Sequence, residues 1–281
     1  MIKIQGLTFT YKDGARPALA GLELDIRDGE FVGIIGSCGA GKSTLTYALN
    51  GVVPHHYTGD MYGSVTVEGL DTVESSPEEI SRYVGSVFQD VDGQMVSAVV
   101  EDEVLFGMEN FGVPRSEIES RLEQALAEAG ISELRHRATS TLSGGQKQKV
   151  AIAAIIALRP KIIVLDEPTG ELDPRSSRRV FDTLRELNEN HGITIVVVEQ
   201  KIMLLCEYVK RLLLMDGGRV VLDGAVGDVL RQTEVFETAG VNIPRVATLA
   251  RELTKLGYYS GATPTGLAQA ETMMREVLGN G

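Results

Sequence analysis

The chain has 281 residues, of which 43% are hydrophobic and 23% charged, a composition typical of a folded globular protein rather than a disordered one. Its formal net charge of -12 argues against non-specific binding to nucleic acid or to anionic lipid, because both attract basic surfaces. The two cysteines, Cys38 and Cys206, form no CxxC pair, so neither a zinc site nor a disulfide framework is expected, and a reducing compartment fits best.

The sequence shows no feature of its own for membrane insertion. Residues 1–6 lack the apolar core of a signal peptide. No apolar run approaches the ~20 residues that cross a bilayer. If the protein works at a membrane, we expect another chain to supply the membrane part.

The first third of the chain is predicted to alternate strands and helices. Strands are expected where apolar and polar residues alternate or where a short apolar run occurs, at 1–10, 22–26, Phe31–Ile35 and 64–67. Helices are expected at Lys42–Asn50, after a glycine-rich turn, and at 77–83, where Pro77 occupies a helix start.

The middle of the chain, from about 97 to 158, has a helical pattern. Apolar residues spaced by three or four predict an amphipathic helix over Glu117–Gly130, with Gly130 as its C-cap. A second helix is expected at Lys149–Leu158.

The later segments return to the alternation of strands and helices. Strands are predicted at Ile162–Leu165 and Ile193–Val198, a helix at 174–190, and a hairpin whose strands 212–215 and 219–222 flank Gly217-Gly218. The fold class is therefore α/β, with a mostly parallel sheet covered on both faces. Residues 226–281 carry glycine and proline breaks and no catalytic pattern, and we interpret them as a small C-terminal extension.

A phosphate-binding loop follows the Phe31–Ile35 strand. Gly36, Ser37, Cys38, Gly39, Ala40, Gly41, Lys42 and Ser43 fit the pattern G-x-x-x-x-G-K-[ST], and Thr44 continues into the helix. Glycines let the backbone N–H groups point at phosphate oxygens, and the helix adds its positive end. Lys42 is predicted to bind the β- and γ-phosphates, and Ser43 to supply a hydroxyl to Mg²⁺. Cys38 is interpreted as a small filler residue that remains open to alkylation or oxidation.

Two acidic residues, Asp166 and Glu167, end the Ile162–Leu165 strand. Ligands gather at the carboxyl ends of strands in an open parallel sheet. Asp166 is predicted to hold Mg²⁺ through water, and Glu167 to polarise the attacking water. Two acids at a strand end can also be a solvated loop, but the upstream phosphate loop favours the catalytic interpretation.

The stretch Leu142-Ser143-Gly144-Gly145-Gln146 is the most informative one. It resembles the signature sequence of ATP-binding cassette (ABC) proteins, and Ser143 with the N–H groups of Gly144 and Gly145 would form a second anion-binding nest. It follows the phosphate loop by about a hundred residues and precedes Asp166-Glu167 by about twenty, which is the order found in that family. The resemblance covers about residues 1–225, with a helical subdomain at about 90–158 and a C-terminal extension at 226–281 that fits a dimerisation element.

The resemblance implies further roles, position by position. Tyr11 matches the aromatic residue that stacks on adenine, and a core tyrosine is the alternative. Gln89 matches the glutamine that touches Mg²⁺ and the attacking water. Asp173 matches the loop that crosses to a second subunit. The resemblance also places the signature residues Ser143 to Gln146 in the nucleotide-binding site. The cofactors that it implies are ATP and Mg²⁺.

One position departs from the family pattern. After the Ile193–Val198 strand the family has a histidine that reads the γ-phosphate, and here Gln200 occupies its place. Glutamine can donate a hydrogen bond but cannot become a cation. Two outcomes stay open: slow hydrolysis of normally bound ATP, or adequate substitution by Gln200.

In the family that the chain resembles, the signature of one cassette closes over the nucleotide in the phosphate loop of another. The resemblance therefore implies that this chain, with one phosphate loop and one signature, pairs with a second cassette, either an identical or a related one. The stretch from Phe88 to Val96, followed by 99–107, resembles the energy-coupling-factor type of importer ATPase, in which a second glutamine follows the first. That resemblance implies a transmembrane coupling subunit at about residues 89–96, uptake of a vitamin or a transition-metal ion, and peripheral attachment to the cytoplasmic face of the cell membrane through the partner only.

Two other function classes are alternatives to a transport ATPase. A DNA-repair clamp would carry a very long coiled-coil insertion or zinc modules, and a translation-type member would carry two cassettes; the sequence shows neither. A nucleotide-binding regulator that scarcely hydrolyses ATP is favoured by Gln200 and opposed by the intact Glu167.

Overall fold

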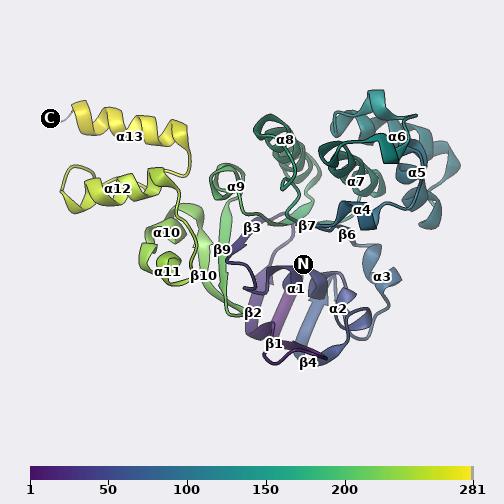
Figure 1. The fold of residues 1–281 in the computed structure, drawn as a ribbon, viewed down its shortest axis with the longest axis horizontal. Coiled ribbons are helices and arrows are strands. Elements are labelled where there is room, and N and C mark those ends of the chain that lie inside the picture. The colour runs from purple at the N-terminus through teal and green to yellow at the C-terminus, as the bar shows by residue number, and fades with distance from the viewer. Residues whose placement is uncertain (280–281) are drawn as a thin grey trace.

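A six-stranded sheet forms the centre of the computed structural model, which describes residues 1–279 (Figure 1). The strand order is β10-β9-β3-β8-β7-β6, and only the β9–β10 pair is antiparallel. The strands are β3 (Phe31–Gly36), β6 (Val84–Val87), β7 (Ile162–Asp166), β8 (Thr194–Val198), β9 (Arg211–Asp216) and β10 (Arg219–Ala225). The predicted mostly parallel sheet and the predicted hairpin are confirmed.

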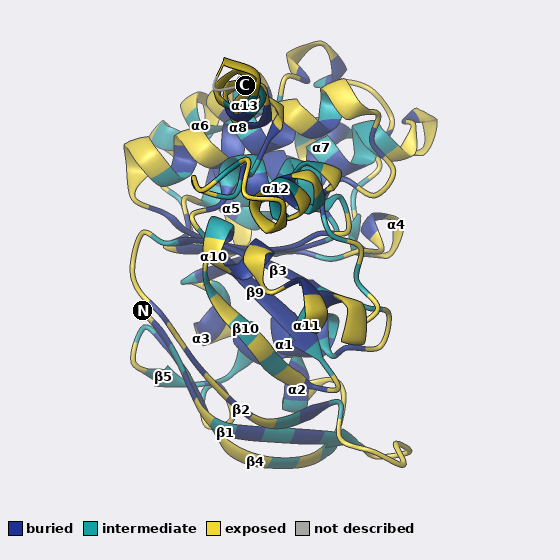
Figure 2. Ribbon diagram, turned by 90° about the vertical axis from the view of Figure 1, so that its left-hand side faces the viewer, coloured by how far each residue is buried: buried dark blue, intermediate teal, exposed yellow. Residues whose placement is uncertain are grey.

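Both faces of this sheet are buried. In β8, Ile195 and Val197 belong to one apolar cluster, whereas Val196 and Val198 belong to another. The strands accordingly form a dark blue layer inside the molecule (Figure 2). Burial on two faces is why these strands are continuous apolar runs in the sequence.

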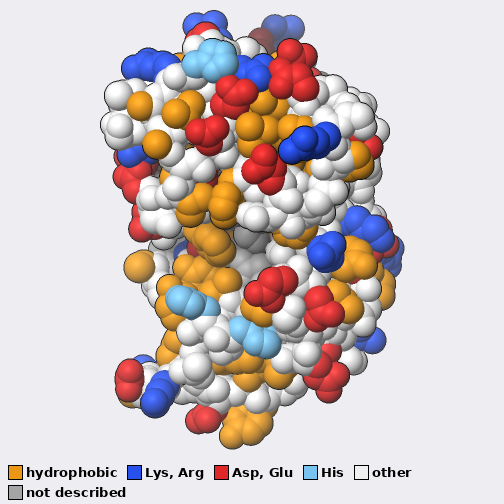
Figure 3. Space-filling model, turned by 90° about the vertical axis from the view of Figure 1, so that its right-hand side faces the viewer, with side chains coloured by type: hydrophobic (Ala, Val, Ile, Leu, Met, Phe, Trp, Pro, Cys, Tyr) orange, Lys and Arg blue, Asp and Glu red, His pale blue; other side chains and the backbone are white. Residues whose placement is uncertain are grey.

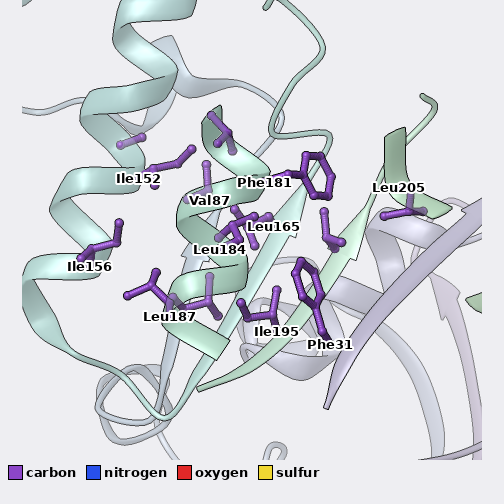
Figure 4. Packing of buried hydrophobic residues seen from close by; sticks show 14 of the residues in the cluster. Phe31, Val87, Ile152, Ile156, Leu165, Phe181, Leu184, Leu187, Ile195 and Leu205 are labelled. Atoms are coloured by element: carbon purple, nitrogen blue, oxygen red, sulfur yellow. The ribbon is translucent and has the colours of Figure 1, made fainter. Parts of the chain in front are cut away.

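The first cluster lies under the long helix α8 (Pro174–His191). Phe181 and Leu184 of this helix point toward Leu165 and Ile195 of the sheet (Figure 4). The second cluster joins the other face of the sheet to helix α1 (Lys42–Leu49) and to a second, antiparallel sheet. The remaining helices around these layers are α2 (Val52–His55), α3 (Pro77–Ser81) and α9 (Ile202–Tyr208).

The antiparallel sheet is built by the N-terminal strands in the order β2-β1-β4-β5. Its strands are β1 (Ile2–Tyr11), β2 (Leu19–Ile26), β4 (Gly59–Val67) and β5 (Leu70–Asp71). The sequence pattern located β4 only at 64–67. Its first half is largely exposed, so it carries no apolar alternation that could have marked it.

The helical region consists of α4 (Val91–Gln94), α5 (Val100–Asn110), α6 (Arg115–Glu128), two short 3₁₀ turns and α7 (Gly144–Leu158). Gly130 has a φ of 63° and follows the end of α6, in the place expected of a capping glycine. The prediction that the second helix begins at Lys149 is wrong. Helix α7 begins at Gly144, because Ser143 and Gln146 form a reciprocal capping box at its start.

The C-terminal segment folds into four helices that the sequence pattern did not locate. They are α10 (Val226–Arg231), α11 (Thr233–Thr238), α12 (Arg245–Lys255) and α13 (Leu267–Gly279). Helix α10 contacts β9, β10 and α12, and α12 contacts α13. Figure 1 shows α12 and α13 at one end of the molecule, far from α5 and α6. No helix within residues 1–279 is long and apolar enough to cross a bilayer.

Candidate active site

A cleft of about 570 Å³ opens where β3 ends and α1 begins. The residues that line it come from six parts of the chain. They are Tyr11 and Ala18 from the N-terminal sheet region, Ile35 to Gly39 with Gly41 to Thr44, Gln89, Glu167, the group Glu199, Gln200 and Ile202, and Gly240 to Asn242. The topology therefore brings together most of the residues that the sequence motifs identified.

The phosphate loop requires glycine at two close approaches. A Cβ atom on Gly36 would lie 2.4 Å from the Met215 carbonyl oxygen. Gly41 has a φ of 97°, and a Cβ atom there would lie 2.4 Å from the Ala18 carbonyl oxygen. Ala40 is not among the described residues that line the cleft, and its side chain is buried in the core. The loop backbone is thereby free to line the cleft at the N-terminal end of α1, where anions bind.

Lys42 is almost fully buried in this loop. Its Nζ atom donates hydrogen bonds of 2.9 Å to the carbonyl oxygens of both Gly36 and Ser37. These bonds hold the ammonium group within the loop that is predicted to bind phosphates. Ser43 and Thr44 follow in the first turn of α1, and both line the cleft.

Tyr11 lies at the edge of the cleft. Its hydroxyl group is 3.0 Å from the Thr44 hydroxyl, and its ring meets Phe9 edge to face at 4.9 Å. The hydrogen bond ties the end of β1 to the first turn of α1. Tyr11 therefore lines the cleft together with residues of the phosphate loop, and its stacking on adenine stays a prediction.

Glu167 is held between two glutamines. Gln89 Nε2 donates to its Oε2 atom at 3.1 Å, and Gln200 Nε2 donates to its Oε1 atom at 2.6 Å. The backbone of Glu167 has a φ of 52°, an uncommon left-handed conformation for a non-glycine residue. Such strain is typical of functional sites, where the surrounding structure fixes a side chain at the reacting centre.

Asp166 lies behind Glu167 and is 2% exposed. Among residues 1–279, neither of its carboxylate oxygens has a hydrogen-bond partner. Burial raises the pKa of Asp166, because the charged form is poorly solvated there. A buried, unpartnered carboxylate near the Ser43 hydroxyl is chemically suited to a hard cation such as Mg²⁺, which binds through few carboxylates together with water and phosphate oxygens. The described residues contain no group of three or more His, Cys, Asp or Glu side chains that could hold a metal by itself.

The signature residues and Asp173 lie outside the set that lines this cleft within residues 1–279. Ser143 caps α7, and a Cβ atom on Gly145 would lie 2.7 Å from Leu172. Asp173 caps α8 and accepts hydrogen bonds from the N–H groups of Arg175 and Ser176. Hydrogen bonding by the Ser176 side chain, together with these N–H groups, lowers the pKa of Asp173. The signature thus packs on the loop before α8 and is not among the residues that line the cleft of its own chain.

Seven residues that line the cleft were not identified as site residues from the sequence. Ala18, Ile35, Glu199 and Ile202 lie in or beside recognised segments, so their positions were available from the order of elements. Gly240 to Asn242 come from the C-terminal extension, and nothing in their spacing marks them as site residues. Their approach to the cleft follows from how α11 packs, which no local pattern encodes.

Comparison with known proteins identifies the family to which the chain belongs. The family model described as ABC transporter matches residues 19–170. The chain is 40% identical to a putative ABC transporter ATP-binding protein of Pyrococcus horikoshii, over 94% of this chain and 93% of the relative. It is also 40% identical to the energy-coupling factor transporter ATP-binding protein EcfA1 of Caldanaerobacter subterraneus, over 92% of each.

Other relatives are longer than this chain. It is 42% and 40% identical to putative ABC transporter ATP-binding proteins of Methanosarcina acetivorans and Methanosarcina mazei, over 90% of its own length. The matched part is 40% and 44% of those two proteins, so the chain spans less than half of their length.

Two solved structures share the fold at appreciable sequence identity. CbiO1 of Clostridium perfringens, described as part of the ABC transporter complex cbiONQ, has a TM-score of 0.73 and 34% identity, over 89% of this chain and 98% of that one. The dimeric bacterial ABC transporter cassette MJ0796 has a TM-score of 0.72 and 30% identity, over 80% and 99% of the two chains.

The chain belongs to the ABC transporter family. It is an ATP-binding subunit with the P-loop fold of that family and is most similar to the energy-coupling-factor type. The cassette of this chain is that of an ATPase. Among its relatives, MJ0796 is described as a dimer and CbiO1 as part of a transporter complex.

Proposed function

We propose that this chain powers an importer of the energy-coupling-factor type, which takes up a vitamin or a transition-metal ion through a separate membrane protein. Similarity along almost the whole chain supports the proposal, since it covers the C-terminal extension as well as the cassette. CbiO1, a similar protein described as part of a transporter complex, also supports the proposal. The subunit would lie at the cytoplasmic face of the cell membrane, attached through its partner only.

The observation that carries the hydrolytic role is the position of Glu167 at the cleft between Gln89 and Gln200. We assign Glu167 the role of orienting and polarising the attacking water. Lys42 and the backbone of residues 36–41 would bind the phosphates, and Tyr11 would stack on adenine. The same contact disfavours a regulator without hydrolysis, because Gln200 supports the catalytic carboxylate rather than leaving it free.

Mg²⁺ would be held by Ser43, Gln89 and Asp166, with the orphaned carboxylate of Asp166 supplying the negative charge. When bound, the ion neutralises charge on the phosphate oxygens. No nucleic acid is expected as a partner, given the acidic chain.

A second cassette subunit would complete the site. Ser143 to Gln146 and Asp173 lie outside the cleft of their own chain, which suits residues that act on the nucleotide of a partner. The exposed signature presents a capped helix start, an arrangement that binds anions well. The dimer can be formed by two identical chains or by this chain and a related one.

The surface at about 89–96 is the proposed contact for the transmembrane subunit. Gln94 is not free for this role, because its amide binds the Phe88 N–H group at 3.0 Å and the Ser86 carbonyl at 2.9 Å. Glu103 accepts hydrogen bonds from the N–H groups of Val96 and Ser97, and the Val96 residue remains 63% exposed. Figure 3 shows hydrophobic side chains gathered around a hollow on the side of the molecule that carries the helical region.

The first test is a pull-down of this chain from detergent-solubilised native membranes, with identification of the co-purifying proteins. A small integral membrane subunit together with a second cassette would support the importer assignment. Recovery of ribosomes, of DNA-repair proteins or of no membrane protein would overturn it.

A matched pair of bait proteins locates the contact. Val96→Asp is expected to lose the membrane subunit while keeping the second cassette, because a charge on the exposed loop opposes apolar docking. Val73→Asp places the same charge at another exposed valine and should recover both partners. Equal recovery by both variants would remove residues 89–96 from the contact.

A further inference from the structure

The loop that follows Glu167 is tied to the segment Glu199–Lys201 by a group of buried hydrogen bonds. Lys201 Nζ donates to the carbonyl oxygens of Thr169 at 2.5 Å and Leu172 at 2.9 Å. It also donates to the Ser177 hydroxyl at 3.1 Å, at the start of α8. The three contacts use all three donors of the ammonium group.

Glu199 binds the same loop through the side chain of Thr169. It is 2% exposed, and its Oε2 atom accepts a 2.5 Å hydrogen bond from the hydroxyl group of Thr169, which is fully buried. Its Oε1 atom accepts the N–H groups of Gln200 at 2.8 Å and Lys201 at 3.1 Å. A buried carboxylate is tolerated here because each oxygen has a donor.

Among residues 1–279, Lys201, Glu199 and Thr169 make no hydrogen bond to the phosphate loop, although Glu199 lines the cleft with it. Gln200, which lies between Glu199 and Lys201, donates directly to Glu167. Lys201 has no carboxylate within ion-pair distance among residues 1–279 and is bound by three neutral oxygens instead. The cation therefore serves to hold two carbonyl groups of the loop, and not to neutralise an acid.

We infer that Lys201, Glu199 and Thr169 are positioning residues for hydrolysis, which fix the strained backbone of Glu167 by joining the loop 167–172 to Gln200. The inference rests on the proposed role of Glu167. We call the hydrogen bonds of Lys201, Glu199 and Thr169 the brace. Loss of the brace is expected to move the Glu167 carboxylate while leaving the phosphate loop intact. Displacement of a reacting group by about 1 Å can lower a rate about a hundredfold.

The test begins with steady-state ATP hydrolysis by Lys201→Met, which keeps the aliphatic stem and removes all three donors. We expect kcat to fall about 10- to 100-fold, with KM for ATP changed less than about twofold. Lys210→Met, at an exposed lysine nine residues later, is the control and should match the unmodified protein. An unchanged kcat in Lys201→Met, or a rise in KM with kcat intact, would overturn the inference.

A second pair of variants keeps the test decisive if Lys201→Met does not fold. Thr169→Val removes the hydroxyl donor to Glu199 at nearly constant volume, and Thr169→Ser keeps it. We expect Thr169→Val to lose kcat and Thr169→Ser to retain most of it. Equal kcat values for the two would contradict the proposed brace.

The Glu167→Gln background separates positioning from a general loss of stability. If Lys201 acts through Glu167, Lys201→Met should not lower the residual rate of Glu167→Gln any further, since the two act as a unit. An additive loss would assign Lys201 a different role. Normal hydrolysis by Glu167→Gln alone would instead refute the proposed role of Glu167, an outcome distinct from failure of the brace.

Discussion

Gln200 donates a 2.6 Å hydrogen bond from its side-chain amide to Glu167, at the position where the sequence pattern predicts a reader of the γ-phosphate. Gln89 binds the other carboxylate oxygen of Glu167 at 3.1 Å. The residue that departs from the family pattern thus binds directly to the carboxylate for which we propose the catalytic role.

Glu167→Gln is expected to keep ATP binding and to lose hydrolysis by about a hundredfold or more, because the amide cannot act as a base toward the attacking water. ATP should then trap a closed dimer, which gel filtration with ATP can detect. Glu189→Gln, at an exposed glutamate near the end of α8, is the matched control. Hydrolysis at the normal rate would remove Glu167 from the catalytic role.

Gln200→Ala is expected to lower kcat about 10- to 100-fold, since a hydrogen bond to a charged group is worth about 1.5–3 kcal/mol. KM for ATP should change little, because Gln200 contacts Glu167 and not the phosphate loop. Gln200→His addresses the alternatives left open by the sequence. A higher kcat with histidine would mean that glutamine slows the site, and an equal or lower kcat would mean that it substitutes adequately.

The phosphate-loop motif and the Asp166-Glu167 pair could be located from the sequence, because each lies where a buried strand meets a turn. Phe31–Ile35 and Ile162–Leu165 are apolar throughout, so their ends and the residues that follow could be located from local pattern. The approach of Gly240 to Asn242 could not be predicted, since it depends on tertiary packing of helices with weak local signals. The hydrogen bonds of Lys201 could not be predicted either, because two of their three acceptors are backbone carbonyl oxygens, which any residue type supplies.

Lys42→Ala is expected to weaken ATP binding at least about tenfold, as loss of a charged hydrogen-bond donor to phosphate costs about 1.5–3 kcal/mol. The lysine also bonds the carbonyl oxygens of Gly36 and Ser37, so its loss frees the loop as well. Titration calorimetry with ATP and Mg²⁺ measures the affinity, and Lys210→Ala serves as control. Unchanged affinity would exclude Lys42 from phosphate binding.

Asp166→Asn tests the proposed Mg²⁺ site through stability. Burial raises the pKa of Asp166 in the folded protein above its value in the unfolded chain, so the folded state holds the proton more tightly. The group therefore destabilises the metal-free protein progressively as pH rises through the folded-state pKa, and it costs nothing below the unfolded value.

At neutral pH in EDTA, Asp166→Asn should raise Tm, by about 2–4 °C for each kcal/mol of relieved desolvation. The difference from the unmodified protein should shrink as pH is lowered, because protonation then neutralises Asp166 itself. Added Mg²⁺ with ATP should stabilise the unmodified protein more than the variant. If Mg²⁺ with ATP raises the Tm of the unmodified protein no more than that of Asp166→Asn, the proposed role of Asp166 in metal binding is wrong.

The two cysteines differ in a way that reports on the cleft. Cys38 is exposed and lines the cleft within the phosphate loop. Cys206 is buried in α9, and burial raises the pKa of its thiol to about 12, so little thiolate forms near neutral pH. We expect N-ethylmaleimide to modify Cys38 alone in the native protein and to abolish ATP binding, since the adduct occupies the phosphate loop.

ATP with Mg²⁺ should slow this modification, because the nucleotide covers Cys38, whereas Cys38→Ser should resist both labelling and inactivation while still binding ATP. Mass spectrometry of the labelled peptides, with and without nucleotide, distinguishes the two thiols. Labelling at an equal rate in saturating ATP would mean that the nucleotide does not cover the loop around residue 38. Modification of Cys206 before unfolding would mean that α9 opens in the native protein, and the contacts of the neighbouring Lys201 would then have to be transient.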